Sequence, residues 1–208
     1  MTALEADHDG PRDGDRRSRR RAERRTQVFE AAIELFVEKG FDNTTMGDIA
    51  ERADVARASV FNYYQRKAAF LDEWSALRRQ RAARAVEEID SGRQNLRANV
   101  TRYLVELAVI SEGARDETLA MSSAILTSYV SSQTALSADL LPYIEQAASR
   151  SELRTGVRSD LVARLVATGY FATLSLWIEP GPAPFDLRAE VVDMLDLLFL
   201  GLLKQPPT

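Results

Sequence analysis

Apolar residues recur every three or four positions along most of the 208-residue chain, a period that predicts helices rather than strands. The first clear pattern follows a run of arginines and predicts a helix that ends at Gly40, because glycine suits a helix C-cap. The residues on its apolar face are Val28, Phe29, Ala32, Ile33, Phe36 and Val37. No segment alternates convincingly between apolar and polar residues, so an all-α fold is expected.

A short helix is predicted next, over residues 45–53. Thr45 is followed three residues later by Asp48, which is the spacing of a capping box. Its inward-facing residues are Ile49 and Ala50. Asp54 then makes the turn, because aspartate tolerates the left-handed backbone conformation better than most residues other than glycine.

A second short helix is predicted over residues 56–63, with Val60 and Tyr64 on its buried side. Ala56 stands at its start and has no side-chain oxygen, so this helix forgoes about 1 kcal/mol of N-cap stabilisation. Two helices of this length joined by a tight turn predict a helix-turn-helix.

A long helix is predicted from Lys67 to about residue 89, where Ser91-Gly92 breaks it. Further helices are predicted over residues 94–111, 116–133, 137–150, 159–179 and 186–204. Pro180-Gly181-Pro182 forms a linker before the last of them. That helix is apolar almost all round, which predicts contact with its own subunit on one side and with a partner on the other.

Composition excludes several kinds of chemistry. The chain has no cysteine and a single histidine, His8, which lies in an Asp- and Gly-rich leader, residues 1–15, that is expected to be disordered. Thiol and histidine catalysis and the usual metal sites therefore lack their central residues, and we expect no catalytic set, no metal and no cofactor. No apolar run is long enough for a membrane span or a signal peptide, so we expect a cytoplasmic location.

Charge is unevenly distributed along the chain. The formal net charge is −4, but residues 16–80 hold fourteen lysines and arginines against ten acidic residues and are net positive. This part contains an arginine run at positions 16, 17, 19, 20, 21, 24 and 25. The predicted helix-turn-helix therefore lies in the basic part of the chain, as expected for a segment that meets DNA.

The stretch GFDNTTMGDIAERADV at residues 40–55, followed by RASVFNYY at 57–64 and by Lys67, resembles the DNA-binding signature of the TetR family. Asp54 stands where that signature usually has glycine, Ala56 where a capping serine is common, and Gln65-Arg66 where proline with serine or asparagine is usual. The resemblance implies an N-terminal three-helix domain, residues 16–67, and a C-terminal helical bundle, residues 68–208, for ligand binding and dimerisation.

Candidate DNA contacts follow from the signature and its helices. The outward side chains of the second short helix can bond base edges or phosphates, and they are Arg57, Ser59, Asn62 and Tyr63. Thr44 and Thr45 lie where a helix N-terminus can meet a phosphate, and Lys67 is placed as a phosphate anchor. By resemblance, Ala58 lies at the DNA surface and permits close approach.

The arginine run has two interpretations. It is either a solvated basic tail or an arm that follows phosphates or enters the minor groove. In the second interpretation, Arg20, Arg21 and Arg24 are DNA contacts.

Candidate ligand contacts are aromatic residues and a methionine on helices that face inward. They are Tyr103, Met121, Tyr129, Tyr170, Phe171 and Trp177. Such a set favours a mostly apolar effector with few polar groups, and Arg102 or Glu106 is placed to supply one charge.

The predicted function is a ligand-responsive repressor. A homodimer formed through the last two helices would bind a near-palindromic operator in double-stranded DNA and release it when a small, largely apolar effector enters the C-terminal domain. The alternatives are an activator or global regulator with the same motif, or a helical ligand carrier or adaptor whose helix-turn-helix is vestigial.

Overall fold

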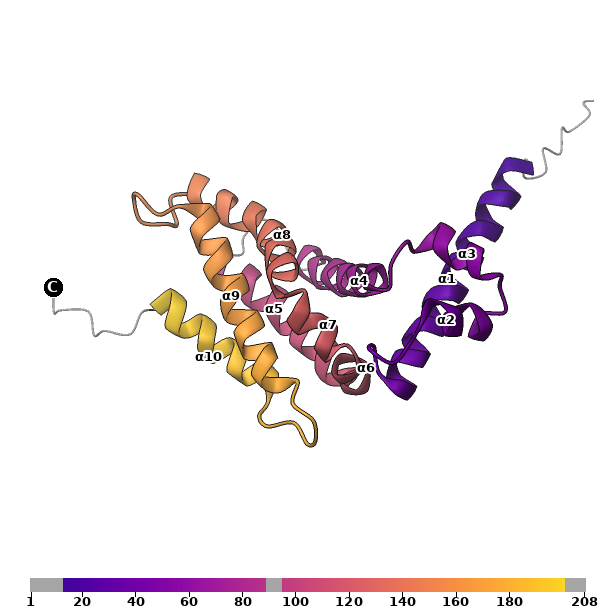
Figure 1. The fold of residues 1–208 in the computed structure, drawn as a ribbon. Helices are drawn as coiled ribbons and strands as arrows, with labels where there is room; N and C mark the ends of the chain where they lie inside the picture. Colours follow the sequence, from indigo (N-terminus) through magenta and orange to yellow (C-terminus); the bar gives the residue numbers. More distant parts are fainter. Residues whose placement is uncertain (1–12, 89–94, 201–208) are drawn as a thin grey trace, which may run out of the picture.

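A computed structural model describes residues 13–88 and 95–200, and every regular element in these ranges is a helix (Figure 1). The elements are α1 (Asp13–Lys39), α2 (Met46–Arg52), α3 (Arg57–Tyr63), α4 (Ala68–Glu87), α5 (Leu96–Gly113), α6 (Arg115–Ala120), α7 (Ser122–Thr127), α8 (Tyr129–Ser149), α9 (Ser159–Trp177) and α10 (Leu187–Leu200). The predicted all-α fold is confirmed. His8, the Ser91-Gly92 break and most of the predicted leader lie outside the described residues.

The helices α1, α2 and α3 form the predicted three-helix unit at one end of the molecule (Figure 1). Thr45 and Asp48 make a full capping box at the start of α2, with Asp48 N–H donating to Thr45 Oγ1 and Thr45 N–H donating to Asp48 Oδ2. Asp54 turns the chain with a φ of 49°. Ala56 caps α3 without any side-chain hydrogen bond. These local predictions are confirmed.

The first part of α4 closes the core of this unit. The ring of Phe70 stacks on Tyr64 at 3.9 Å between centroids and lies 6.1 Å from Phe36. Ile49 and Val60 are fully buried beside them. Because the aromatic cluster joins α1 and α4 to Tyr64 at the end of α3, helix α3 is held by packing as well as by its own backbone bonds.

The helices from α4 onward form a bundle in which α8 lies along α9, α5 lies along α4, and α10 packs on α5 and α9. Gly169 allows α9 and α10 to approach closely, since a Cβ at this position would lie only 2.7 Å from the sulfur of Met194 on α10. Short α6 lies against α1 and joins the bundle to the N-terminal unit (Figure 1).

Two predicted boundaries are wrong. Helix α1 begins at Asp13, two residues before the end of the predicted leader. The predicted break between residues 133 and 137 is absent because α8 runs through it, with the Thr134 hydroxyl donating to Val130 O of the preceding turn. The chain instead breaks at Met121 and Ser128.

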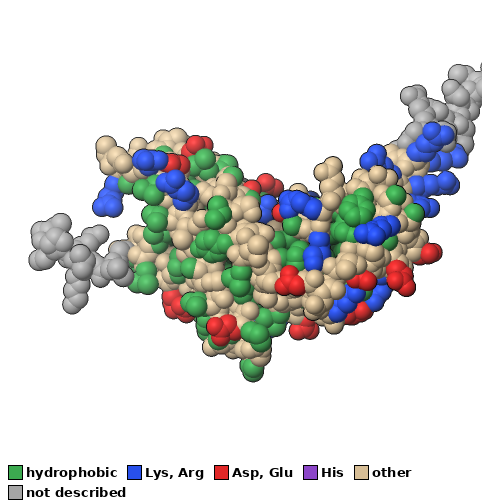
Figure 2. Space-filling model, viewed as in Figure 1, with side chains coloured by type: hydrophobic (Ala, Val, Ile, Leu, Met, Phe, Trp, Pro, Cys, Tyr) green, Lys and Arg blue, Asp and Glu red, His purple; other side chains and the backbone are tan. Residues whose placement is uncertain are grey.

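The last helix is less uniformly apolar at its surface than predicted. Leu187, Val191 and Leu195 are buried in the bundle. Its exposed positions mix Leu197 and Leu200 with acidic residues. The outer face of α9 is more clearly apolar, with Leu161, Leu165 and Leu176 exposed. Figure 2 shows hydrophobic side chains spread over this part of the molecule.

We expect Gly40→Ala to lower the free energy of unfolding by about 1–2 kcal/mol, because Gly40 has a φ of 86° that disfavours any side chain. Gly113→Ala is the matched control. Gly113 ends α5, and a Cβ added there would meet nothing within 4 Å, so its substitution is expected to raise stability by up to about 0.5–1 kcal/mol. Urea denaturation followed by circular dichroism measures both. Equal effects of the same sign would contradict the backbone argument.

Candidate DNA-binding surface and ligand cavity

The recognition helix α3 presents a polar face to solvent. Arg57, Ala58 and Asn62 are exposed, and Ser59 and Tyr63 are half-buried. Val60 alone in α3 is buried, so it fixes the rotation of the helix. The side chains of α3 that were predicted to face outward are therefore at least partly exposed. Their contacts with DNA stay predictions.

Arg21 of α1 joins this face. A recess of about 390 Å³ is lined by Arg21, Ser59, Asn62 and Tyr63, which come from two helices far apart in sequence. Arg20 and Arg24 are exposed on the same part of α1, where Figure 2 shows lysine and arginine side chains gathered. Arg21 therefore lies beside α3, and the contacts of the arginine run with DNA stay predictions.

Phe61 is a surface residue that the sequence analysis did not select. Its side chain is 40% exposed on α3, and the guanidinium of Arg57 lies 5.8 Å from its ring centroid. An exposed aromatic ring on a recognition helix can contact a thymine methyl group. The available signal was the helical spacing from Arg57, which places residue 61 on the same outward face.

Thr44 is a correction. It was predicted to meet a phosphate, but it is only 1% exposed, and its hydroxyl lies 2.9 Å from Gly40 O and 3.3 Å from Leu35 O. The hydroxyl therefore ties the loop after α1 to the end of that helix. Thr45 is exposed and remains a candidate, although its side chain already accepts the Asp48 N–H.

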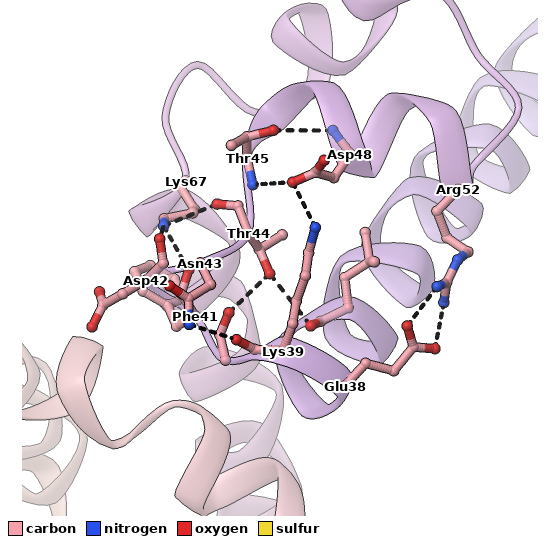
Figure 3. Close-up of polar contacts among 12 residues, drawn as sticks. Glu38, Lys39, Phe41, Asp42, Asn43, Thr44, Thr45, Asp48, Arg52 and Lys67 are labelled. Atoms are coloured by element: carbon pink, nitrogen blue, oxygen red, sulfur yellow. Dashed lines mark hydrogen bonds and ion pairs between the residues drawn. The ribbon is translucent and has the colours of Figure 1, made fainter.

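Lys67 is a second correction. Its ammonium group donates to three backbone carbonyls, those of Phe41 at 2.6 Å, Thr44 at 3.0 Å and Asp42 at 3.1 Å (Figure 3). It also lies 4.5 Å from the ring centroid of Phe41. An ammonium group has three N–H donors, so these bonds commit all of them. Lys67 is a structural cross-link rather than a phosphate anchor.

Charged pairs fix α2 on α1 in the same region (Figure 3). Lys39 lies 2.8 Å from Asp48, and this bond together with those from Thr45 lowers the pKa of Asp48 to about 2. Arg52 makes a two-pronged pair with Glu38. These side chains form ion pairs between α1 and α2, so they fix the position of α2. The polar side chains of α3 remain directed to solvent.

A further network joins the middle of α1 to α4. Arg25 donates to both carboxylate oxygens of Glu73 at 2.7 and 2.5 Å, and the Tyr64 hydroxyl donates to the same carboxylate at 2.7 Å. Burial, reinforced by the bond to Glu73, raises the pKa of Tyr64. Arg25 is therefore engaged in holding α1 on α4, unlike its predicted DNA-contacting neighbours in the arginine run.

A small cavity lies inside the bundle, between α4, α5, α6, α7, α8 and α9. Its volume is about 50 Å³. It is lined by Trp74, Ser75, Arg78, Arg79, Leu107, Ser111, Thr118, Ile125, Ser132, Leu136, Tyr170, Phe171 and Leu174. Tyr170 and Phe171 were predicted ligand contacts, and burial raises the pKa of Tyr170 to about 12. The structure thus brings two of the six predicted residues together at a cavity.

The other four do not line this cavity. Tyr103 is buried and donates its hydroxyl to Asp139 at 3.1 Å, and burial raises its pKa. Trp177 is buried and donates to Phe185 O. Met121 fills the core at the α6–α7 break, and Tyr129 packs edge-on to Phe171. Tyr103, Trp177 and Met121 are therefore core residues, whereas Tyr129 is half-buried.

The charged residues of the cavity, Arg78 and Arg79, differ from the two that the sequence suggested. Arg102 donates to Ala85 O and Glu106 pairs with Arg81, both away from the cavity. Arg78 lines the cavity, with its guanidinium 3.6 Å from the Trp74 ring centroid. The sequence gave no signal that Arg78 is buried, because it lies in an arginine-rich part of α4 and long arginine side chains usually reach solvent.

Metal clusters and membrane spans are both absent from the part of the chain that the structure describes. Within residues 13–88 and 95–200, no group of three or more acidic, histidine or cysteine residues could hold a metal ion. None of the helices in the same ranges has the length and apolar character needed to cross a bilayer.

A small three-helix unit with an outward recognition helix, attached to a larger helical bundle, is the architecture of a helix-turn-helix transcriptional regulator. Residues 28–74 match the family model described as "Bacterial regulatory proteins, tetR family". Together with the structural relatives, this match supports a TetR-family transcriptional regulator.

The most informative relative is a solved structure, that of FadR from Thermus thermophilus, a TetR-family repressor in complex with lauroyl-CoA. It is 26% identical, with a TM-score of 0.74, and the match covers 88% of this chain and 98% of that one. Among curated proteins, the regulator YdeS of Bacillus subtilis (strain 168) is 43% identical over 44 residues, 21% of this chain and 22% of that protein. LuxR of Vibrio harveyi is 35% identical over 85 residues, 39% of this chain and 41% of that protein.

We expect Lys67→Met to lower the free energy of unfolding by about 2 kcal/mol, because three carbonyls lose a charged donor. Arg66→Gln is the control, since its exposed ion pair with Asp72 contributes less than about 1 kcal/mol. Thermal and urea unfolding measure both. A Lys67 variant as stable as the Arg66 variant would contradict the cross-link.

Proposed function

We propose that the protein is a ligand-responsive transcriptional repressor that binds a near-palindromic operator as a homodimer. The observation that carries the proposal is the recess where Arg21 of α1 meets Ser59, Asn62 and Tyr63 of α3. A short polar helix with an adjacent cation suits the major groove and the phosphates that border it. The intact capping box and buried core of the unit argue against a vestigial motif.

Each α3 would read one half-site. Asn62 and Arg57 would bond base edges, Phe61 would contact a thymine methyl, and Ser59, Tyr63 and Thr45 would bond phosphates. Ala58 has no bulky side chain and would allow close approach. Arg20, Arg21 and Arg24 would follow the backbone from α1.

Dimerisation is proposed through α9 and α10. The exposed leucines of α9 lie on one face of the helix, at positions 161, 165 and 176, and exposed leucines of α10 extend the apolar surface. A two-fold pairing of these helices would bury these side chains and set two α3 helices on one side of the dimer.

The effector is proposed to be an amphiphile with an apolar chain. Support comes from the Thermus thermophilus relative, which is in complex with lauroyl-CoA and matches 88% of this chain. The cavity offers apolar walls inside the bundle, but its volume of about 50 Å³ is far below the roughly 300 Å³ of small ligand sites. Binding would therefore have to spread the helices that line it.

That requirement supplies a mechanism for release. Helix α4 lines the cavity with Trp74 and Arg78 and, near its start, anchors α3 through Phe70. A ligand that favours the spread bundle would favour a different placement of α3, and linkage requires DNA and ligand to weaken each other by the same factor.

The first test is DNA binding. Genomic fragments that the purified protein selects define the operator, and fluorescence anisotropy on that operator gives the affinity as a function of salt. Asn62→Ala is expected to weaken binding by about 1–3 kcal/mol and relax specificity at one position. Arg21→Gln is expected to reduce the salt slope by about one.

Two variants serve as controls for this test. Lys67→Met, corrected for its lower stability, and Arg81→Gln on the far side of α4 are expected to leave the salt slope unchanged. No preference of the wild type for any duplex would refute the proposal. Addition of lauroyl-CoA is expected to release the operator, and a reporter gene in cells separates repression from activation.

The dimer interface is tested with two leucines of equal exposure. Leu165 on α9 is 48% exposed and Leu77 on α4 is 49% exposed. Leu165→Glu is expected to shift the protein to monomer at micromolar concentration, because it places charge in the proposed interface, whereas Leu77→Glu is expected to stay dimeric. Light scattering after size exclusion gives the mass. A dimeric Leu165 variant would contradict this interface.

A further inference from the structure

Arg78 is a cation almost enclosed by the bundle. Its side chain keeps 11% of its accessible surface, and the Trp74 ring covers one face of the guanidinium. Burial lowers the pKa of Arg78 to about 10, which still leaves it protonated at neutral pH. A buried positive charge is unfavourable unless a close negative charge compensates it.

The compensation of Arg78 is incomplete. Its Nη2 lies 3.4 Å from Glu117 Oε2, longer than the roughly 2.7–2.9 Å of a strong charged hydrogen bond. Glu117 keeps 40% of its accessible surface and also accepts a bond from Trp74 Nε1. The remaining partners of Arg78 are neutral hydroxyls, Thr118 at 3.1 Å and Ser111 at 3.5 Å.

Arg79 provides the contrast within the same cavity. Its Nε donates to Asp139 Oδ2 at 2.7 Å, and the Tyr103 hydroxyl donates to the same oxygen. Of the two cations that line the cavity in the described chain, Arg79 has the closer carboxylate, at 2.7 Å, whereas the carboxylate of Glu117 lies 3.4 Å from Arg78. The cavity wall also includes Leu107, Ile125 and Leu174, which lie beside hydroxyl-bearing residues such as Ser132 and Tyr170.

We propose that the effector carries a carboxylate on an apolar body, and that this carboxylate forms a two-pronged pair with the guanidinium of Arg78. The inference deepens the proposed ligand-controlled function, because it names the ligand class and the residue that recognises it. A carboxylate fits the paired N–H donors of arginine, and the low-dielectric surroundings strengthen the bond. The hydrocarbon lies against the leucine and isoleucine side chains.

The probes are dodecanoate, its methyl ester and lauroyl-CoA, which share one chain and differ in the headgroup. Calorimetry with the DNA-free protein gives each affinity. Dodecanoate is expected to bind the wild type, and Arg78→Met is expected to weaken that binding roughly 10- to 100-fold. The methyl ester is expected to bind weakly and equally to both proteins.

Two further variants and a stability measurement serve as controls. Arg81→Gln removes one charge from an exposed position of α4 and is expected to bind dodecanoate like the wild type. Arg78→Lys is expected to recover part of the lost affinity because it restores a cation. Thermal unfolding checks that every variant is folded, and Glu117, being partly exposed, stays solvated when Arg78 is replaced.

The outcomes separate this inference from the proposed function. Equal dodecanoate affinity in the wild type and the Arg78→Met variant overturns the carboxylate site, as does binding of lauroyl-CoA without binding of dodecanoate. Release of the operator by lauroyl-CoA alone would leave the proposed function standing in that case. Arg78-dependent binding of dodecanoate that leaves DNA affinity unchanged supports the carboxylate site and overturns ligand-controlled release.

Discussion

The backbone of Phe41 is the point on which the arrangement of the two parts of the molecule depends. Its carbonyl accepts a bond from the Lys67 ammonium at 2.6 Å, and its N–H donates to Ala120 O of α6 at 3.3 Å. Its ring packs on Phe36 at 4.9 Å. One residue in the loop after α1 thus contacts the end of the recognition segment, the bundle and the core of the N-terminal unit.

The six residues of α6 contact both the cavity residue Arg78 and the loop residue Phe41. Glu117 and Thr118 meet Arg78 at the cavity, and Ala120 O holds Phe41. A group that draws Arg78 away from α6 changes the contacts of the same short helix that supports the loop before α2. A chain of direct contacts through α6 therefore connects Arg78 to Phe41.

Much of the N-terminal unit was predictable from sequence, because its signals are local. A capping box, a C-cap glycine and a left-handed aspartate depend on neighbouring residues, and all three were identified. Thr44 and Lys67 were misassigned because their partners are backbone carbonyls, which sequence patterns do not display. In the bundle, Arg78 was missed because burial of a long cation is decided by which helices surround it, and the breaks at Met121 and Ser128 carry neither glycine nor proline.

The departures from the family signature become intelligible once packing is considered. A seven-residue helix such as α3 is too short to be stable alone, and Ala56 gives it no side-chain cap. Its stability must come from the burial of Val60 and from the stacking of Tyr64 on Phe70. Both contacts lie on the inner face or just beyond the helix end. The exposed residues on the outer face of α3, among them Arg57 and Asn62, therefore do not supply the burial that stabilises this helix.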